Sequence, residues 1–306
     1  MKTATLNHWE RKLQQAVSLS HDDPYGEMNL KTIAEMLNES LHNFSHKFVE
    51  FYGEPYMQFV KRRRLEAGAG LLRHSDFSIG LISDMCGYMP SAFSKAFRAL
   101  YHEAPVSFRN RIYLPNEMYT LQRAKVASTP DDDPESLIFS ADRTESVTLP
   151  DSILYYNILP RNNDPIRSMV TYMTMYQQQL YAIKSSLQLP GAMIITGTLD
   201  VVPVTTYNKM MMYVGILVPR MKAYDMAHLQ ISLHFQEPFN LFTKRLPGGP
   251  YKKLPVPMDF ASAGVPMYEF INRSCRAGYF KMSGNHFFIS LTGDRNSEIF
   301  IPWQRR

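Results

Sequence analysis

The sequence predicts two domains, an all-α N-terminal domain with two helix-turn-helix copies and a C-terminal α+β domain. Three observations carry this prediction. A helical motif occurs twice with an offset of 49 residues, an acidic segment with prolines follows at 129–136, and strand and helix patterns alternate from about residue 145. The 306 residues correspond to about two domains of ordinary size. We therefore expect domains at 1–112 and 145–306, joined by a linker at 113–144.

The composition excludes several classes of protein. Apolar residues make up 45% of the chain and charged residues 20%, so the chain can bury real cores and is not disordered throughout. No apolar run approaches the roughly 20 residues that cross a bilayer. The N-terminus also lacks the apolar stretch of a secretory signal, so we expect a cytoplasmic protein without a membrane partner. Cys86 and Cys275 are the only cysteines, which indicates a reducing compartment.

The repeat near the N-terminus is the most informative feature of the sequence. The segment 33–38 (IAEMLN) is echoed by 82–87 (ISDMCG). The segment 44–48 (FSHKF) is echoed by 93–97 (FSKAF) with the same offset of 49 residues and no insertion between the parts. In each copy this pattern predicts a short helix, a tight turn and a second helix, which is the helix-turn-helix arrangement.

Residues at the turn and at the start of the second helix support this prediction. Asn38 and Gly87 stand at the turns, and both residue types tolerate a left-handed backbone. Ser40 is a candidate N-cap in the first copy, and Pro90 suits the first helical turn in the second. The second helices carry apolar stripes, namely Leu41, Phe44, Phe48 and Phe51 in the first copy and Phe93, Phe97 and Leu100 in the second.

A longer helix is predicted between the two copies, over residues 55–72. Pro55 suits its first turn, whereas Gly68 and Gly70 weaken it. The run from Lys61 to Arg64 would usually be a solvated helix face. Because it lies between two helix-turn-helix copies, contact with phosphate groups is an equally good interpretation.

The polar faces of the two second helices predict contacts with DNA, and a pair of protein-binding helical hairpins is the alternative. The net charge of +5 is compatible with a polyanionic partner. The candidate base contacts are His42, Ser45 and His46 in the first copy and Ser91, Ser94 and Lys95 in the second, and the candidate phosphate contacts are Lys47, Arg62, Arg63 and Arg98.

Residues 28–111 resemble the DNA-binding domain of the AraC/XylS transcription regulators, in which a long central helix joins two helix-turn-helix motifs. The matching segments are 30–37, 40–45, 64–67, 87–88, 91–97 and 104–109. The resemblance implies a sequence-specific transcription regulator that binds double-stranded DNA, with RNA polymerase as a candidate partner. This chain departs from the family pattern in having one residue fewer between Tyr88 and the second recognition helix.

The character of the sequence changes after the helical copies. The segment 129–136, with two prolines around three aspartates, is typical of an exposed connector. Strand-like patterns then cover 152–159, 192–198, 209–218, 229–235, 241–246, 286–291 and 298–301, and helical patterns cover 165–187 and about 258–276. The strand at 229–235 is assigned because apolar and polar residues alternate along it. The order strand, helix, strand, strand therefore occurs twice, which predicts two pseudo-repeated halves.

This order resembles the gyrase-inhibitor-like effector-binding domain of the Rob type, in which two such halves flank a central cleft. The supporting segments are 244–251, 278–279 and 299–303. The resemblance implies a small-molecule effector, bound in a cleft whose candidate wall residues are Met211, Tyr213, Tyr268 and Phe288, although each could equally be an ordinary core residue. Phe288 stands where multidrug-sensing relatives carry a glutamate, so we expect a neutral or anionic, partly aromatic ligand.

No motif of a catalytic site is recognisable in the sequence. The G-x-S-x-G elbow, the P-loop lysine motif and the G-x-G-x-x-G fingerprint do not occur. His42 and His46 lie one helical turn apart without a nearby acid or cysteine, so we predict no metal, no cofactor and no enzyme. Two alternatives stay open. One is a small-molecule hydrolase of the gyrase-inhibitor-like superfamily with a vestigial DNA-binding head, and the other is a ligand-independent regulator whose second domain binds proteins.

Overall fold

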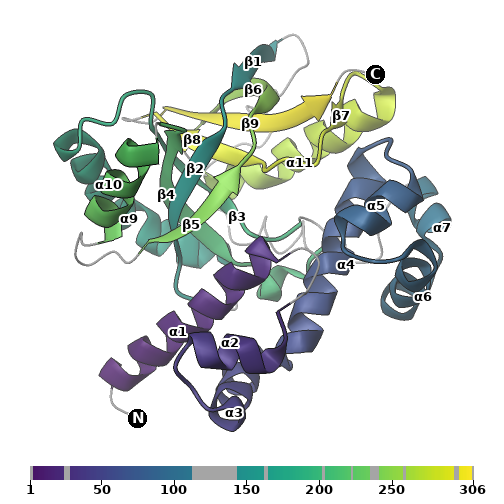
Figure 1. Cartoon of the computed structure of the whole chain (residues 1–306). Helices are drawn as coiled ribbons and strands as arrows, with labels where there is room; N and C mark the ends of the chain where they lie inside the picture. Colours follow the sequence, from purple (N-terminus) through teal and green to yellow (C-terminus); the bar gives the residue numbers. More distant parts are fainter. Residues whose placement is uncertain are drawn as a thin grey trace. The chain divides into compact units, whose positions relative to one another are not determined.

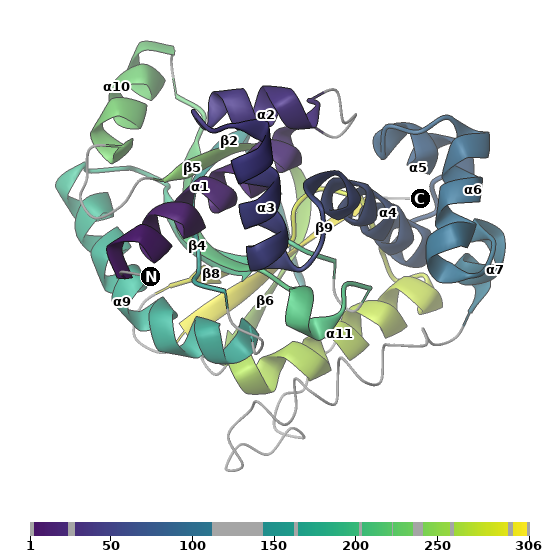
Figure 2. The ribbon, with the colours of Figure 1, turned by 90° about the horizontal axis from the view of Figure 1, so that it is seen from below.

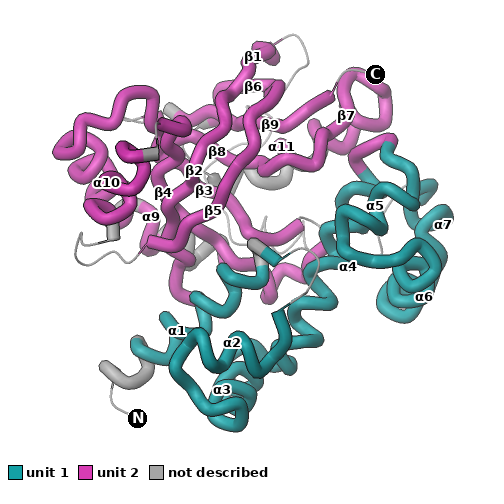
Figure 3. The backbone as a smooth tube through the Cα atoms, in the orientation of Figure 1, with its two compact units in different colours: residues 1–73, 77–112 teal, residues 74–76, 113–306 magenta. Residues whose placement is uncertain are grey.

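The computed structural model divides the chain into two compact units (Figures 1 and 3). The N-terminal unit comprises residues 1–73 and 77–112, and the C-terminal unit comprises residues 74–76 and 113–306. The structure describes residues 3–23, 28–111, 143–161, 165–201, 204–221, 223–234, 241–257, 260–292 and 296–304. Nearly all of the predicted linker lies outside these residues. None of the helices within the described ranges is long and apolar enough to cross a membrane.

The N-terminal unit is entirely helical in the described residues. Its helices are α1 (Thr3–Asp22), α2 (Leu30–Met36), α3 (Leu41–Tyr52), α4 (Tyr56–His74), α5 (Ile79–Met85), α6 (Pro90–Tyr101) and α7 (Pro105–Asn110). The long helix α4 stands between two helix pairs, α2–α3 and α5–α6 (Figure 2). The two predicted helix-turn-helix copies and the central helix are therefore confirmed.

Local signals in the sequence determine where the helices of each pair begin and end. The Ser40 hydroxyl accepts a hydrogen bond from the backbone N–H of Asn43, which confirms Ser40 as the N-cap of α3. Pro90 is the first residue of α6, as predicted. Asn38 and Gly87 adopt left-handed backbones, with φ of 53° and 66°, at the two turns.

The apolar stripe of each second helix is narrower than predicted. Phe44 and Phe48 of α3 are fully buried, and the Phe48 ring contacts Phe59 of α4 with the ring centroids 5.3 Å apart. Phe93 and Phe97 of α6 are likewise fully buried. The outer members of the stripes, Leu41 and Leu100, are exposed instead. Two phenylalanines one helical turn apart therefore hold each second helix against the rest of the unit.

The C-terminal unit is built on an antiparallel sheet. Its elements are β1 (Glu145–Leu149), β2 (Ser152–Ile158), α9 (Pro165–Ser186), β3 (Met193–Thr198), η3 (Tyr207–Lys209), β4 (Met212–Pro219), α10 (Ala223–His234), β5 (Phe242–Leu246), β6 (Gly249–Pro257), α11 (Phe260–Ala277), β7 (Lys281–Met282), β8 (Phe288–Leu291) and β9 (Asn296–Gln304). The sheet has nine strands in the order β1-β6-β9-β8-β3-β4-β2-β5, and β7 pairs with β9.

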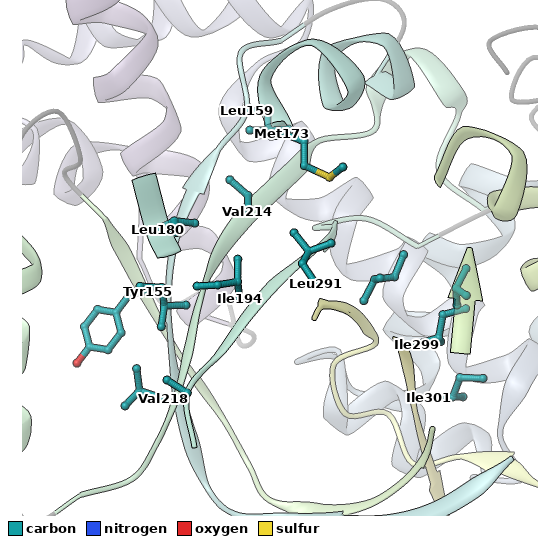
Figure 4. Close-up of a cluster of buried hydrophobic side chains, with 14 of the residues drawn as sticks. Tyr155, Leu159, Met173, Leu180, Ile194, Val214, Val218, Leu291, Ile299 and Ile301 are labelled. Carbon is teal, nitrogen blue, oxygen red and sulfur yellow. The ribbon is translucent and has the colours of Figure 1, made fainter. Parts of the chain in front are cut away.

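One apolar core joins this sheet to the helices α9, α10 and α11. The strands contribute side chains such as Ile194, Val214 and Leu291, which Figure 4 shows gathered on one face of the sheet. The helices contribute Leu180 of α9 and Leu233 of α10 among others. Strand residues that alternate with these core residues face the other side of the sheet.

The predicted strand at 229–235 is wrong, because these residues belong to helix α10 up to His234. Leu229 and Leu233 are buried in the core, whereas Ile231 is 59% exposed. In a strand, residues 229, 231 and 233 would share one face, but in a helix residue 231 points away from its neighbours. The alternation fits a strand as well as a helix over so short a window, and the helix begins six residues earlier, at Ala223.

Strand β6, which contains three prolines, was not predicted from the sequence. Proline lacks a backbone N–H and is normally confined to the edges of sheets. β1 pairs only with residues 249–253 of β6, whereas β9 pairs with residues 251–257. Pro255 and Pro257 therefore lie beyond the end of β1, where β6 has a partner strand on one side only. The other predicted strands and both predicted helices of this unit are confirmed within a few residues at their ends.

Candidate DNA-binding surface

Helix α3 presents two histidines on its polar face. His42 and His46 are exposed, and Ser45 is half-buried, with its hydroxyl donating to the backbone oxygen of Leu41 at 2.7 Å. The Lys47 ammonium is bound to the carboxylate of Glu50 at 2.7 Å. This hydrogen bond from Lys47, together with its charge, lowers the pKa of Glu50. A phosphate contact by Lys47 would therefore compete with an existing ion pair.

Helix α6 presents its cations without such a constraint. Ser91, Lys95 and Arg98 are exposed, and Ser94 is half-buried. Within the part of the chain that the structure describes, neither Lys95 nor Arg98 has an acidic partner. Arg98 also lies in the last turn of α6. The second copy therefore offers two cations to an anionic partner, whereas the first offers neutral or ion-paired groups.

The structure does not place Arg62 at the phosphate-binding surface that we predicted. Its guanidinium lies 2.7 Å from a carboxylate oxygen of Glu54 and 2.9 Å from one of Glu66, and the side chain is only 11% exposed. Burial disfavours the charge, but the hydrogen bonds and charges of the two glutamates outweigh it and raise the pKa of Arg62. Arg62 therefore neutralises two buried carboxylates inside the N-terminal unit.

The other residues of the basic run on α4 also differ from one another. Lys61 is exposed. Arg63 is half-buried, with its guanidinium 5.3 Å from the centre of the Phe59 ring. Arg64 donates hydrogen bonds to backbone oxygens of the turn between α5 and α6. The four adjacent cations thus have four different environments. Lys61 faces solvent and Arg63 contacts an aromatic ring. Arg62 forms ion pairs, and Arg64 binds the end of α5.

Comparison with known proteins identifies this helical unit. Residues 33–111 match a family described as a helix-turn-helix domain. The regulatory protein PocR of Salmonella typhimurium is 29% identical to this chain over 104 residues, which cover 34% of each protein. The transcriptional activator RhaS of Salmonella paratyphi B is 31% identical over 110 residues, which cover 36% of this chain and 39% of RhaS. The chain carries an AraC-type helix-turn-helix domain.

The matched segments span only about a third of the length of the curated relatives. Among solved structures, the C-terminal domain of EcmrR is 12% identical to this chain, with a TM-score of 0.35, and covers 53% of this chain and 98% of that one. In the AraC-type domain of this chain, α3 and α6 are the second helices of the two copies. Of the predicted base contacts, Ser45 and Ser94 are half-buried and the other four are exposed.

The candidate effector residues of the C-terminal unit are buried where they are described. Met211, Tyr213 and Phe288 have at most 5% exposure, and the side chain of Tyr268 lies outside the described side chains. Tyr213 and Phe288 alternate with Val214 and Ile289, which belong to the core beneath the helices. Tyr213 and Phe288 therefore lie on the opposite face of the sheet.

The structure joins Tyr213 and Phe288 through residues that sequence reasoning missed. The Tyr213 hydroxyl lies 2.8 Å from Nε2 of His286, and the Tyr251 hydroxyl donates to the backbone oxygen of His286 at 3.2 Å. Tyr251 contacts Phe288, which stacks on Phe300 with the ring centroids 4.9 Å apart. We call Tyr156, Tyr213, Phe242, Tyr251, His286, Phe288 and Phe300 the aromatic cluster. Tyr156, Tyr213, Phe288 and Phe300 stand on the four strands β2, β4, β8 and β9, so no local pattern in the sequence joins them.

The polar groups of the aromatic cluster are uncharged. Burial raises the pKa of the Tyr213 hydroxyl well above its ordinary value. Burial, and to a smaller extent the charge of Lys244, lowers the pKa of His286. A neutral imidazole and a neutral phenol therefore share this hydrogen bond at neutral pH.

In the described part of the chain, no group of three or more histidine, cysteine, aspartate or glutamate side chains could hold a metal ion. A groove of about 450 Å³ lies beside β1 and is lined by Ser146, Val147, Thr148, Pro250, Trp303 and Gln304. Met211, Tyr213 and Phe288 do not line this groove.

Proposed function

We propose that the chain is a transcription regulator that reads a specific DNA sequence with α3 and α6. The observation that carries this proposal is the pair of exposed polar helices in the AraC-type domain, with Lys95 and Arg98 available to an anionic partner. Helix-turn-helix motifs place their second helices in major grooves, and two such helices on one face of a duplex read grooves about 34 Å apart. His42, Ser45, His46, Ser91, Ser94 and Lys95 are the proposed base contacts, and Lys47, Arg63 and Arg98 are the proposed phosphate contacts.

Binding of the full chain to DNA tests this proposal directly. Genome-wide mapping of the bound protein would define an operator, which is then used in titrations at several salt concentrations. We expect affinity that falls steeply with salt and exceeds the affinity for random duplex DNA by 10³-fold or more. Equal affinity for operator and random DNA, or no binding at low salt, would refute the proposal. RNA polymerase is the partner through which such a regulator would act.

The C-terminal unit is the proposed effector-binding domain. Its strands can be grouped as β2-α9-β3-β4 and β6-α11-β8-β9, each with the order strand, helix, strand, strand. In the sheet these halves occupy adjacent blocks, β6-β9-β8 and β3-β4-β2, which meet where β3 pairs with β8. This order supports two pseudo-repeated halves, as in the gyrase-inhibitor-like domain, with the aromatic cluster on the sheet face opposite the core that contains α9, α10 and α11.

The proposed effector is a neutral or anionic molecule with an aromatic part. Aromatic side chains stack on aromatic ligands, whereas a buried cation needs an acidic partner to offset its desolvation. Phe288 supplies no charge, and His286 is neutral. Glu298 lies on the neighbouring strand but is bound to the ammonium of Lys253 at 3.1 Å. Its carboxylate therefore already has a cationic partner, which Glu145 shares at 3.1 Å.

A thermal-shift screen of the full chain tests the class of effector. We expect anionic and neutral aromatic compounds to raise the unfolding temperature more than quaternary ammonium dyes of similar size. A dominant response to the dyes would contradict the proposal. Chemical turnover of any stabilising compound would favour the alternative of a hydrolase instead.

A further inference from the structure

Arg64 belongs to the basic run of α4, yet its guanidinium is bound to the turn of the second helix pair. Nε donates to the backbone oxygen of Cys86 at 2.7 Å, and Nη2 donates to the backbone oxygen of Gly87. Cys86 is the C-cap of α5, and Gly87 is the left-handed residue that starts the turn. One side chain of the central helix thus satisfies two consecutive carbonyls where α5 ends.

The same guanidinium also holds the third residue of this turn. It lies over the ring of Tyr88, 4.3 Å from the ring centre. The Tyr88 ring in turn contacts Phe93 of α6, with the centroids 6.1 Å apart. Arg64 therefore contacts residues 86, 87 and 88, which together set the direction in which the chain enters α6.

The chemistry of arginine suits this position better than that of lysine. The carbonyl end of a helix carries a partial negative charge, which favours a cation. A guanidinium offers several N–H donors in one plane and stacks on aromatic rings, whereas an ammonium is a compact point charge. Only the planar fork can donate to two carbonyls while its face lies on Tyr88.

Gly68, one helical turn after Arg64, adds a second point of close contact between α4 and this pair. A Cβ atom at Gly68 would lie 2.8 Å from the Phe93 ring and 3.1 Å from Sγ of Cys86. The absence of a side chain at this position lets Phe93 approach the central helix. Arg64 and Gly68 share one face of α4 and together seat the second helix pair.

The turn of the first helix pair is held in a different way. Its left-handed residue is Asn38, and the next residue, Glu39, binds the ammonium of Lys12 at 2.5 Å. Glu39 also accepts a hydrogen bond from the side chain of Asn43 on α3. Lys12 lies on α1, so the first turn does not depend on Arg64.

We infer that Arg64 is a positioning residue of the second DNA-reading helix, and that it acts without touching DNA. It fixes the orientation of α6 against α4 and thereby sets the specificity of the half-site that α6 reads. This inference rests on the proposed function, in which α3 and α6 each read one half-site.

The test compares the full chain with Arg64→Lys, Arg64→Gln and Lys61→Ala, the last being the exposed neighbour in the same run. Affinity is measured for the intact operator and for operators in which one half-site has been scrambled. We expect Arg64→Lys and Arg64→Gln to lose roughly fivefold or more in affinity for the intact operator, since the loss of one good base contact costs at least about that factor. Scrambling the half-site that α6 reads should lower the affinity of these two variants only a little further. Scrambling the half-site that α3 reads should lower their affinity by the same factor as it lowers that of the parent.

The salt dependence of binding separates positioning from phosphate contact. A lost phosphate contact lowers the slope of log affinity against log salt by about one. We expect this slope to stay unchanged in Arg64→Gln. The change of slope in Lys61→Ala shows how much an exposed cation of the same helix contributes to it. Restoration of parent affinity by Arg64→Lys, together with a reduced slope in Arg64→Gln, would overturn the inference in favour of phosphate contact.

Hydrogen exchange provides a readout that does not need DNA. In Arg64→Lys we expect faster amide exchange across residues 86–93, with residues 37–44 unchanged as the internal control. Unchanged exchange across 86–93 would overturn the inference. A parent chain that binds no operator, but whose exchange still depends on Arg64, would refute the proposed function alone.

Discussion

Arg62 and Glu66 lie one helical turn apart on α4, with Nη1 of the arginine 2.9 Å from Oε1 of the glutamate. Glu54, from the turn between α3 and α4, binds the same guanidinium at 2.7 Å. All three side chains are largely buried. The end of the first helix pair is thereby tied to the central helix by charge as well as by the packing of Phe48 on Phe59.

Removal of this guanidinium should destabilise the N-terminal unit. In Arg62→Ala, two buried carboxylates would lose their shared cation, and breaking a buried ion pair in this way costs about 3–5 kcal/mol. Urea unfolding of the full chain, followed by circular dichroism, measures the change. Lys61→Ala is the matched control and should stay within about 0.5 kcal/mol of the parent. An Arg62→Ala chain of parent stability with a reduced salt slope would instead restore Arg62 as a phosphate contact.

Gly68 of α4 and Gly80 of α5 should respond in opposite directions to substitution by alanine. In Gly68→Ala the new Cβ would lie 2.8 Å from the Phe93 ring, and overpacking of this kind costs about 1–3 kcal/mol. In Gly80→Ala the nearest atom is 3.8 Å away, so the gain in helix propensity should stabilise the chain by about 0.5–1 kcal/mol. Thermal unfolding of both variants measures the difference. Equal stabilisation by both would show that Phe93 is free to move.

Lys95 should contribute to specificity rather than to general affinity. We expect Lys95→Ala to weaken binding to the operator by about 1–3 kcal/mol and to random DNA very little. Lys47→Ala is the comparison on α3, where the ammonium is already bound to Glu50. Competition titrations with operator and random duplexes measure both effects. A loss by Lys95→Ala of the same size on both duplexes would reassign Lys95 to phosphate contact.

Substitutions in α10 distinguish the observed helix from the strand that the alternation predicted. Leu233→Ala should cost about 2–5 kcal/mol of unfolding free energy, because Leu233 is fully buried in the core. Ile231→Lys should change it by less than about 0.5 kcal/mol, since Ile231 is exposed on the other side of the helix. Denaturant unfolding of the full chain measures both. If residues 229, 231 and 233 shared a buried face, Ile231→Lys would be as damaging as Leu233→Ala.

The His286 imidazole should make the stability of the C-terminal unit sensitive to acid. Burial, with a smaller effect of Lys244, lowers the pKa of His286 below its unfolded value of about 6.5. The unfolded chain therefore binds the proton more readily, and the contribution of His286 to stability is present above pH 6.5 and lost as the pH falls below it. The slope from this one group is at most about 1.4 kcal/mol per pH unit.

Urea unfolding of the full chain between pH 7 and pH 5 measures this dependence. His286→Gln should flatten the profile, whereas His42→Gln, which alters an exposed histidine of α3, should leave it as in the parent. Parallel profiles for the parent and His286→Gln would contradict the assignment of a buried neutral imidazole.

The sequence by itself determined the features that depend on neighbours a few residues away. Ser40 caps α3 and Pro90 begins α6 because capping and helix initiation are local to the backbone. Asn38 and Gly87 mark the turns because few residue types accept a left-handed backbone. The repeat with its offset of 49 residues then places both helix pairs, since two copies of one local pattern fold alike.

Only the tertiary structure decided where each charged or aromatic side chain finds its partner. Four adjacent cations on α4 look alike in the sequence, but Arg62 meets Glu54 and Arg64 meets the turn at Cys86 because packing brings those groups within reach. In the same way Tyr213 meets His286, 73 residues away, only because the sheet places β4 near the start of β8. Local sequence patterns carry no information on such distant pairs. Each contact forms between chain segments that become neighbours only when the chain folds, so its free energy depends on the tertiary structure.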